Sequence, residues 1–328
     1  HTSGLPSLPS NFMPKDPGNP YADYTVAQLY EFLAGYQLPR DPGAAYDYSN
    51  LGAGLLGHAL ALRAGMDYET LVRTRITARL AMNSTSIALS DSMRQRLAKG
   101  HDPQRQRTQN WDFPTLAGAG ALRSTANDLL NFLAANLGQK PSPLSPAMAS
   151  MLVPRRPTPK PRIQVALGWH IVTTGDGREL VWHNGGTGGY RSFVAFDPKD
   201  HTGVVVLSNM STNEGVDDIG LHLLDPSSPL LPPKKGRKKI AVDPAVLERY
   251  VGKYQLAPTF LITITREGNH LFAQATAQPR FEIFPETDHD FFLEAVDAQI
   301  SFVTDSTGRV TKAILHQGGV DQDAKRIE

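Results

Sequence analysis

The spacing of apolar residues changes once along the chain, from a period of about 3.6 residues to a period of 2, and this change limits the fold more than any other feature. Tyr24 to Leu137 shows the helical period, and a Pro-rich stretch, Lys140–Arg162, separates it from segments that alternate. The pattern predicts a mainly helical region followed by β-strands. The fold class that we predict is α+β.

The helical region carries recognisable start signals. Thr25, Ser49 and Ser124-Thr125 precede apolar patterns and are candidate N-caps. A further short helix is predicted around Ala147–Leu152. The residues expected on the buried faces of the first two helices are Val26, Leu29, Tyr30, Phe32 and Leu33, and then Leu51, Leu55, Leu56, Ala59 and Leu60.

Four strand candidates follow, with connections too short to contain crossover helices. They are therefore expected to form an antiparallel meander. Glu214–Leu224 is predicted to be a helix that packs Val216, Ile219 and Leu223 on this sheet. The four candidates are Leu167–Thr173, Glu179–His183, Arg191–Phe196 and Gly203–Ser208.

A Pro-, Ser- and Lys-rich segment divides the chain. We predict a first domain over 1–225, a linker over 226–239 and a second domain over 240–328. The second domain contains about eight short alternating segments separated by turns, which favour a small antiparallel β-barrel. These segments are Lys253–Gln255, Leu261–Arg266, His270–Ala275, Arg280–Pro285, Phe291–Ala295, Gln299–Thr304, Val310–His316 and Lys325–Glu328.

Composition argues against several classes of function. The 33 basic and 32 acidic residues give a formal charge of +1, so no overall field attracts nucleic acid. No apolar run approaches the about 20 residues of a membrane helix. The absence of Cys removes thiol chemistry, and the ten histidines show no metal-binding spacing. We therefore expect no metal, no cofactor, no nucleic-acid partner and no membrane span.

Tyr48-Ser49-Asn50 stands at the start of a strong helical pattern. A phenol near a cation loses its proton more easily and can act as a general base, and an Asn amide can hold a substrate carbonyl. The alternative is that the tripeptide is simply an N-cap turn.

His183-Asn184-Gly185-Gly186 ends an apolar strand. Glycines at a strand edge leave backbone N–H groups accessible, as the stabilisation of an oxyanion requires. The alternative is a Gly-rich hairpin turn. A phosphate-binding loop is disfavoured because no helix follows the glycines. A Gly-x-Ser-x-Gly nucleophile motif is absent, which argues against an α/β-hydrolase.

These segments occur in an order that resembles class C β-lactamase-like serine hydrolases, a group that includes DD-peptidases and esterases. The resemblance covers about residues 1–225, and the tail resembles the lipocalin-like barrel of some members. The matching segments are His1–Pro6, Tyr48–Asn50, Gly118–Leu129, His183–Gly186 with Gly188–Tyr190, and Val204–Asn209.

The resemblance implies a set of catalytic and substrate-binding residues. Tyr48 would assist proton transfer, Asn50 would position the substrate and the catalytic Lys, and His183 would replace the Lys of the Lys-Thr-Gly motif. Gly185 would allow close approach of the substrate, and the Gly186 N–H would be one donor of the oxyanion hole. The implied substrate is a small-molecule or peptide amide or ester.

The Ser-x-x-Lys motif of the family does not occur in this sequence. No lysine has Ser or Thr three residues before it. In the family this motif lies upstream of the His-Thr-Ser-Gly block, so we expect a domain without its N-terminal elements and an inactive chain on its own. Ser3 and Ser49 are poor substitutes, because neither has a Lys at helical spacing.

Three explanations follow: a fragment of a longer enzyme, a partner chain that supplies the missing part, or a short protein with a binding role. The first two predict that the missing segment or another chain covers an exposed sheet edge. The third predicts a non-catalytic protein that retains the family cleft and uses the barrel to bind a peptide or an apolar ligand. From the resemblance alone, a periplasmic or extracellular location is expected.

Overall fold

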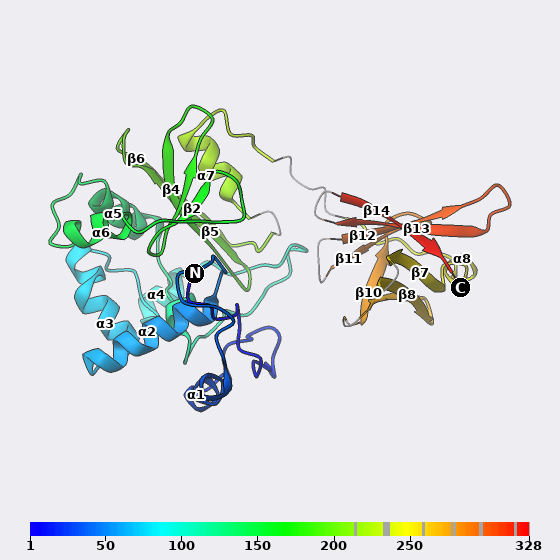
Figure 1. The fold of residues 1–328 in the computed structure, drawn as a ribbon, viewed down its shortest axis with the longest axis horizontal. Helices are drawn as coiled ribbons and strands as arrows, with labels where there is room; N and C mark the ends of the chain where they lie inside the picture. The colour runs from blue at the N-terminus through cyan, green and yellow to red at the C-terminus, as the bar shows by residue number, and fades with distance from the viewer. Residues whose placement is uncertain are drawn as a thin grey trace. The chain divides into compact units, whose positions relative to one another are not determined.

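The computed structural model describes residues 1–212, 215–231, 237–257, 260–276, 278, 280–294, 298–317 and 320–327. The chain forms two compact units, His1–Pro232 and Pro233–Glu328 (Figure 1). Part of the predicted linker, 232–236, lies outside the described residues. No described helix is long and apolar enough to cross a membrane.

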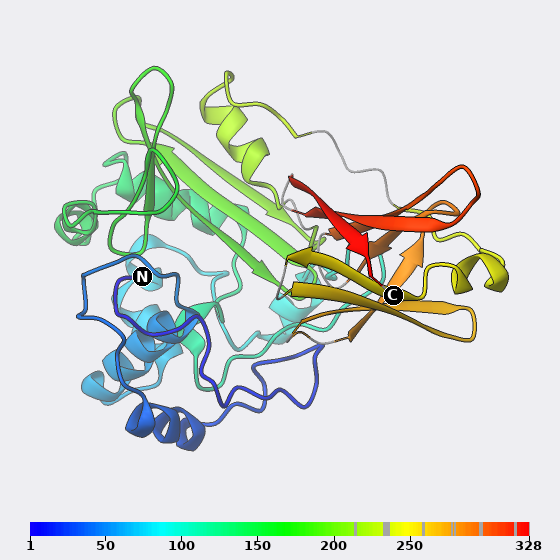
Figure 2. The same cartoon turned by 45° about the vertical axis from the view of Figure 1, so that its right-hand side comes forward.

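Helices dominate the first part of the N-terminal unit, as the 3.6-residue period predicts (Figure 2). Their start signals are confirmed at Thr25, Ser49 and Thr125, whose side chains each accept a backbone N–H of the first turn. The elements are α1 (Val26–Gly35), α2 (Asn50–Ala64), α3 (Tyr68–Arg75), η1 (Thr77–Leu80), α4 (Asp91–Arg96), η2 (Ala117–Ala119), α5 (Ala126–Asn136), α6 (Ser145–Met151) and α7 (Asp217–Leu224).

The predicted apolar faces of α1 and α2 are partly wrong. In α1, Leu29 and Phe32 are buried, whereas Tyr30 is 47% exposed. In α2 the buried face consists of Leu51, Gly54, Gly57 and Ala61, and Leu56 and Leu60 face outward. The reason is close packing: a Cβ at Gly57 would lie 3.0 Å from the backbone of Gly118 in η2. Small residues bring α2 against η2 and leave its leucines exposed.

The sheet of the N-terminal unit is an antiparallel meander, as predicted, with strand order β1-β2-β3-β4-β5-β6. Two strands were not predicted, one within the Pro-rich stretch and one directly after it. The strand predicted over Leu167–Thr173 begins later, at His170, because Gly168 adopts a positive φ of 77°. The strands are β1 (Arg156–Pro157), β2 (Ile163–Val165), β3 (His170–Thr173), β4 (Glu179–Thr187), β5 (Tyr190–Asp197) and β6 (Thr202–Ser208).

Helices cover both faces of this sheet. Leu133 of α5 packs with Val181 and Phe196 on one face. On the other face α7 packs on β5 and β6, with Phe193 in the buried cluster (Figure 1). The predicted face of α7 is wrong in part: Val216 is buried, but Ile219 and Leu223 are exposed and Leu221 and Leu224 pack inward. Glu214, where this helix was predicted to begin, lies outside the described residues.

The C-terminal unit is a closed antiparallel barrel of eight strands, which confirms the prediction. Short helix α8 (Pro244–Glu248) precedes it. Side chains fill its interior, among them Tyr254 and Phe291, which are both 0% exposed. The strands are β7 (Gly252–Ala257), β8 (Phe260–Glu267), β9 (His270–Ala275), β10 (Arg280–Pro285), β11 (Asp290–Leu293), β12 (Ala298–Thr304), β13 (Val310–Gln317) and β14 (Val320–Arg326).

Candidate active site

A cleft of about 1010 Å³ in the N-terminal unit brings together all five residues that the sequence analysis singled out. Tyr48 and Asn50 reach it from the start of α2. His183, Gly185 and Gly186 reach it from the end of β4. Two segments about 135 residues apart in the sequence therefore line the same space.

Ser49 holds the start of α2 in place. Its Oγ accepts the Gly52 N–H at 2.8 Å and donates to the Pro6 carbonyl at 2.6 Å, and the residue is 1% exposed. Ser3 Oγ accepts the Leu5 N–H at 3.2 Å. Both hydroxyls therefore serve local structure, and the N-cap interpretation of Ser49 is confirmed. Tyr48 and Asn50 flank this cap and are turned toward the cleft by it.

The Tyr48 phenol is packed rather than activated. Its ring lies 4.0 Å from the His1 ring, centroid to centroid, and burial raises the pKa of the hydroxyl. Burial also raises the pKa of Tyr21, and the hydrogen-bonding side chain of Asn50 opposes that rise. The Tyr48 hydroxyl is therefore protonated at neutral pH in this structure. A cation brought close to it would be needed to lower its pKa.

The end of β4 is an open strand edge. β3 pairs with β4 only as far as His170 opposite Trp182, whereas β5 pairs with β4 through Thr187. The predicted end of this strand at His183 is wrong, because β4 continues to Thr187 and the turn lies at Gly188-Gly189. The alternative of a hairpin turn at Gly185-Gly186 is wrong for the same reason. Residues 183–187 thus face the cleft with one edge that no described strand covers.

The two glycines of this edge have close cross-strand neighbours. A Cβ at Gly185 would lie 2.6 Å from Ser192 Oγ, and one at Gly186 would lie 2.2 Å from Arg191 Nη1. Glycine also keeps the edge free of side chains that would hold a ligand away from the backbone. The arrangement allows a ligand to reach the backbone of β4.

His183 is held in one tautomer. Its Nδ1 lies 2.6 Å from the Asn184 carbonyl oxygen, which can only accept a hydrogen bond, so Nδ1 carries the proton. Burial lowers the pKa of the imidazole, although the hydrogen bond to Asn184 and the charge of Asp217 oppose this. At neutral pH the ring is therefore uncharged, and Nε2 has a free lone pair that can accept a proton.

A buried second histidine lies beside His183. The His170 ring lies 5.5 Å from the His183 ring, and its Nε2 lies 3.1 Å from the Tyr46 hydroxyl. Burial, followed by the positive charges of His183, the chain terminus and Lys160, lowers the pKa of His170 to about 4. This residue could not be identified from the sequence, because a lone histidine after a Trp carries no recognisable signal.

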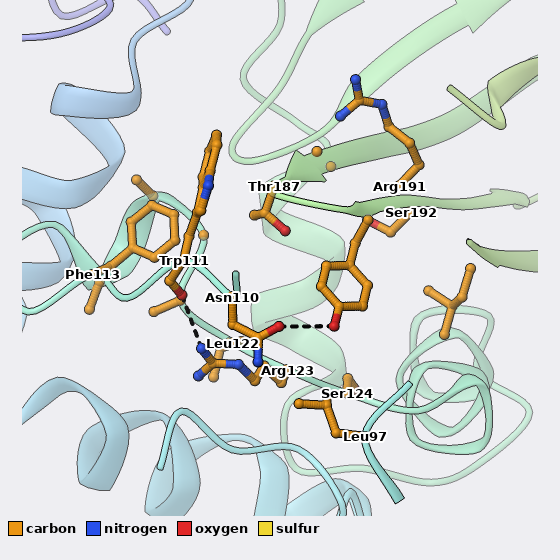
Figure 3. A pocket seen from close by; sticks show the side chains of 18 of the residues that line it. Leu97, Asn110, Trp111, Phe113, Leu122, Arg123, Ser124, Thr187, Arg191 and Ser192 are labelled. Carbon is orange, nitrogen blue, oxygen red and sulfur yellow. Dashed lines mark hydrogen bonds between the residues drawn. The ribbon is translucent and has the colours of Figure 1, made fainter. Parts of the chain in front are cut away.

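The opposite wall of the cleft is aromatic and basic. Figure 3 shows Trp111 and Phe113 on one side and Thr187 and Ser192 from the sheet on the other. Arg123 donates to the Trp111 carbonyl at 3.0 Å. The described lining contains three arginines and no acidic side chain; the arginines are Arg96, Arg123 and Arg191. The described residues contain no cluster of His, Cys, Asp or Glu that could hold a metal ion.

Family models match both units. Residues 1–225 match the model described as Beta-lactamase, and residues 236–327 match a domain of unknown function, DUF3471.

Two curated relatives are named as a penicillin-binding protein and as a carboxypeptidase. Penicillin-binding protein 4* of Bacillus subtilis is 26% identical over 351 residues, which cover 100% of this chain and 77% of that protein. D-alanyl-D-alanine-carboxypeptidase/endopeptidase AmpH of Escherichia coli is 26% identical over 224 residues, which cover 61% of this chain and 56% of that protein. The chain thus spans about half the length of AmpH.

Solved class C β-lactamases share the fold of the N-terminal unit. The enzyme from Rhodobacter sphaeroides aligns with a TM-score of 0.53 and 26% identity over 65% of this chain and 66% of that one. Another class C β-lactamase aligns with a TM-score of 0.56 and 21% identity over 65% of this chain and 63% of that one. The second likeness shows the fold alone.

Proposed function

This chain belongs to the Beta-lactamase family, and from that premise we propose that its cleft is the acyl-transfer site of a serine hydrolase whose Ser-x-x-Lys segment lies on polypeptide outside these 328 residues. The observation that carries the proposal is the convergence of Tyr48, Asn50, His183, Gly185 and Gly186 on one cleft. The location that we propose is periplasmic or extracellular, in keeping with relatives named as penicillin-binding and carboxypeptidase proteins.

Each cleft residue has a chemical task in this proposal. The backbone N–H of Gly186, on the open edge of β4, donates to the oxyanion that forms when the serine attacks a carbonyl. The Asn50 amide holds the substrate or the lysine of Ser-x-x-Lys. That lysine supplies the cation that lowers the pKa of Tyr48, so the phenol can take part in proton transfer. The neutral Nε2 of His183 accepts or returns a proton at the leaving group.

Two exposed features, a strand edge and an apolar helix face, support the proposal that further polypeptide covers this unit. β6 is the last strand in the order of the described sheet, and its edge sequence Thr-Gly-Val-Val-Val-Leu-Ser is strongly β-forming. Leu56 and Leu62 on α2 are 60% and 62% exposed. Unpaired edges and apolar faces of this kind are normally covered in folded proteins. A segment with a strand and apolar helices would cover both.

The substrate class that we propose is an amide or ester that carries a carboxylate. The described cleft lining has no acidic residue. Arg123 already pairs with Asp112 at 3.1 Å, so Arg96 and Arg191 are the lining cations that favour an anionic group. Trp111 and Phe113 offer an apolar wall for the remainder of the substrate. Small peptides with a free carboxyl end and β-lactams have this combination of groups.

The direct test compares this chain with a longer gene product that contains Ser-x-x-Lys. Nitrocefin and p-nitrophenyl ester turnover are measured for both. We expect turnover by the longer protein only, since the 328-residue chain lacks the nucleophile. A longer protein that is inert toward a broad panel of amides and esters would contradict the proposal.

A second candidate is a non-catalytic protein that binds a ligand or peptide in the same cleft. It is favoured by the engaged hydroxyls of Ser3 and Ser49, which leave this chain without an evident nucleophile. The filled interior of the barrel directs this candidate to the cleft and not to the barrel lumen. Calorimetry of the 328-residue chain with a carboxylate-bearing peptide would show reversible binding. An added mass after incubation with a β-lactam would exclude it.

A further inference from the structure

Two phenyl rings lie side by side on the outer wall of the barrel. Ile283 and Phe291 point into the core, so their sequence neighbours Phe284 and Phe292 point outward. Phe284 lies opposite Phe292 in the pairing of β10 with β11 (Figure 1), and the two ring centroids are 5.8 Å apart. Phe292 is nevertheless only 4% exposed. Other residues therefore cover a ring that the strand turns away from the core.

A short basic segment before α8, residues 237–240, lies over these rings, and we call it the strap. The guanidinium carbon of Arg237 lies 5.5 Å from the centroid of the Phe292 ring. The Nζ of Lys239 lies 3.4 Å from the centroid of the Phe284 ring. The face of an aromatic ring attracts a cation placed over it. Each outward ring thus has one cation of the strap over it.

A carboxylate beside each ring pairs with the same cation. Arg237 Nη1 lies 3.4 Å from Glu286 Oε2, and Lys239 Nζ lies 3.0 Å from Glu294 Oε1. Side chains of an extended segment alternate in direction, so cations two residues apart can face one surface. Lys238, between them, is exposed. The wall therefore offers two sites, each with a ring and a carboxylate, at the spacing of an extended basic segment.

A third outward ring on the same wall is paired differently. Phe272 on β9 has the Arg280 guanidinium carbon 3.9 Å from its ring centroid. Arg280 belongs to the neighbouring strand β10 and also pairs with Glu267. This cation site is complete within the barrel strands. The sites at Phe284 and Phe292, in contrast, receive their cations from the strap.

The predicted linker ends in the basic run Arg237-Lys238-Lys239, and a solvated tail of this kind would be free to bind an acidic partner. We propose that the partner is the outer wall of β10 and β11, which is a binding site for an extended basic segment and has the strap of the same chain as its ligand. The backbone extends the contact, because Ile240 donates its N–H to the Pro285 carbonyl at 3.0 Å. None of these contacts belongs to the barrel interior, so the strap can leave the wall while the barrel stays folded.

The test follows the strap by two readouts on the full chain. The ring current of Phe284 should shift the side-chain protons of Lys239 upfield in the NMR spectrum, and hydrogen exchange of the Ile240 amide reports release of the strap. The double variant Arg237→Ala, Lys239→Ala should lower protection of that amide about tenfold. It loses two cation–ring contacts and two exposed ion pairs, each with a small contribution. Protection should not change with protein concentration; a rise with concentration would assign the strap to a second copy and overturn the proposal.

Three single variants separate the strap from the rest of the wall. Phe284→Leu keeps an apolar side chain but removes the ring, so it should abolish the upfield shift of the Lys239 protons and lower protection of the Ile240 amide. Arg280→Ala is the matched control, because it removes a cation–ring contact of the same kind that does not involve the strap, and Lys238→Ala removes a cation outside these contacts. Both should leave protection unchanged. Unshifted Lys239 protons in the unmodified protein, or equal losses of protection in Arg280→Ala and the double variant, would overturn the proposal.

Discussion

The two sheets of this protein end in opposite ways. In the N-terminal unit the final residues of β4 pair with β5 alone and line a cleft. In the C-terminal unit the pairs β9–β10 and β14–β7 close the ring. A closed ring satisfies its backbone groups internally, whereas an open edge leaves them for a ligand. The open sheet is accordingly the one that carries the groups suited to chemistry.

Burial follows the same division. The barrel buries large aromatic side chains such as Tyr254 and Phe291, which stabilise it. The N-terminal unit buries an ionisable group, His170, whose Nδ1 has no hydrogen-bond partner in the described structure. An unpaired buried polar atom costs stability. The N-terminal unit therefore gives up stability beside its cleft, and among the described residues no buried side-chain atom of the barrel lacks a hydrogen-bond partner in this way.

The largest expected effect concerns the open edge. In a longer chain that carries Ser-x-x-Lys, His183→Ala should lower the rate of acylation by about 10²- to 10⁴-fold, because the proton acceptor at Nε2 is lost. Stopped-flow measurement with nitrocefin checks this.

Ser49→Ala is the matched comparison. It removes an N-cap, so we expect a loss of about 1 to 2 kcal/mol in the free energy of unfolding and a much smaller effect on acylation. Equal and small effects of the two substitutions on acylation would contradict the assigned roles.

The stability of the barrel should depend on the packing of its interior side chains. Phe291→Ala removes a fully buried ring, and we expect the free energy of unfolding of the C-terminal unit to fall by about 3 to 5 kcal/mol. Hydrogen exchange resolved by peptide separates this unit from the other. A loss below about 1 kcal/mol would show that the interior repacks and is not the rigid core described above.

The buried His170 should make the N-terminal unit sensitive to acid. Its folded pKa of about 4 lies below the ordinary value of about 6.5, so the unfolded chain binds a proton that the folded chain excludes. The free energy of unfolding should therefore fall by about 2 to 3 kcal/mol as the pH falls from 7 to 4.

His170→Phe should remove most of this dependence, as followed by urea unfolding at several pH values. His58→Phe is the control, because His58 also contacts a tyrosine hydroxyl, that of Tyr30 at 2.8 Å, but lies on the helical surface. If both variants keep the full dependence, the acid sensitivity has another source.

The smallest expected effect lies on the exposed face of α2. Leu56→Ala should change the free energy of unfolding of the 328-residue chain by less than about 0.5 kcal/mol, because the side chain is 60% exposed. In a longer chain whose added segment covers α2, the same substitution should cost about 2 kcal/mol or more. Chemical denaturation of the two proteins gives the comparison, and equal small losses would show that nothing covers this face.

Local signals made much of the fold predictable. Caps at Thr25 and Ser49, short connections between strands, and regular turns in the tail depend on neighbouring residues, and the structure has them as predicted. The faces of α2 and α7 were predicted less well. Glycines at 57 and 220 let the backbone approach Gly118 and Phe193 closely, and this reverses the face that leucine spacing indicates.

The candidate site shows the same limit. Tyr48, Asn50 and His183 were identified because their motifs are local, but nothing local marks His170 or Arg123. Arg123 lines the cleft and reaches the Trp111 carbonyl, and His170 lies beside His183 because β3 ends opposite Trp182. Such contacts arise from the pairing of distant segments, which periodicity cannot specify.

The most direct measurement is to locate a covalent adduct. A longer gene product that contains Ser-x-x-Lys is incubated with a β-lactam, digested and analysed by mass spectrometry, with the 328-residue chain treated in parallel. The account predicts an added mass on the serine of Ser-x-x-Lys and none on the 328-residue chain. An adduct on Ser3 or Ser49, or the absence of an adduct on the longer protein under conditions where it is folded, would contradict it.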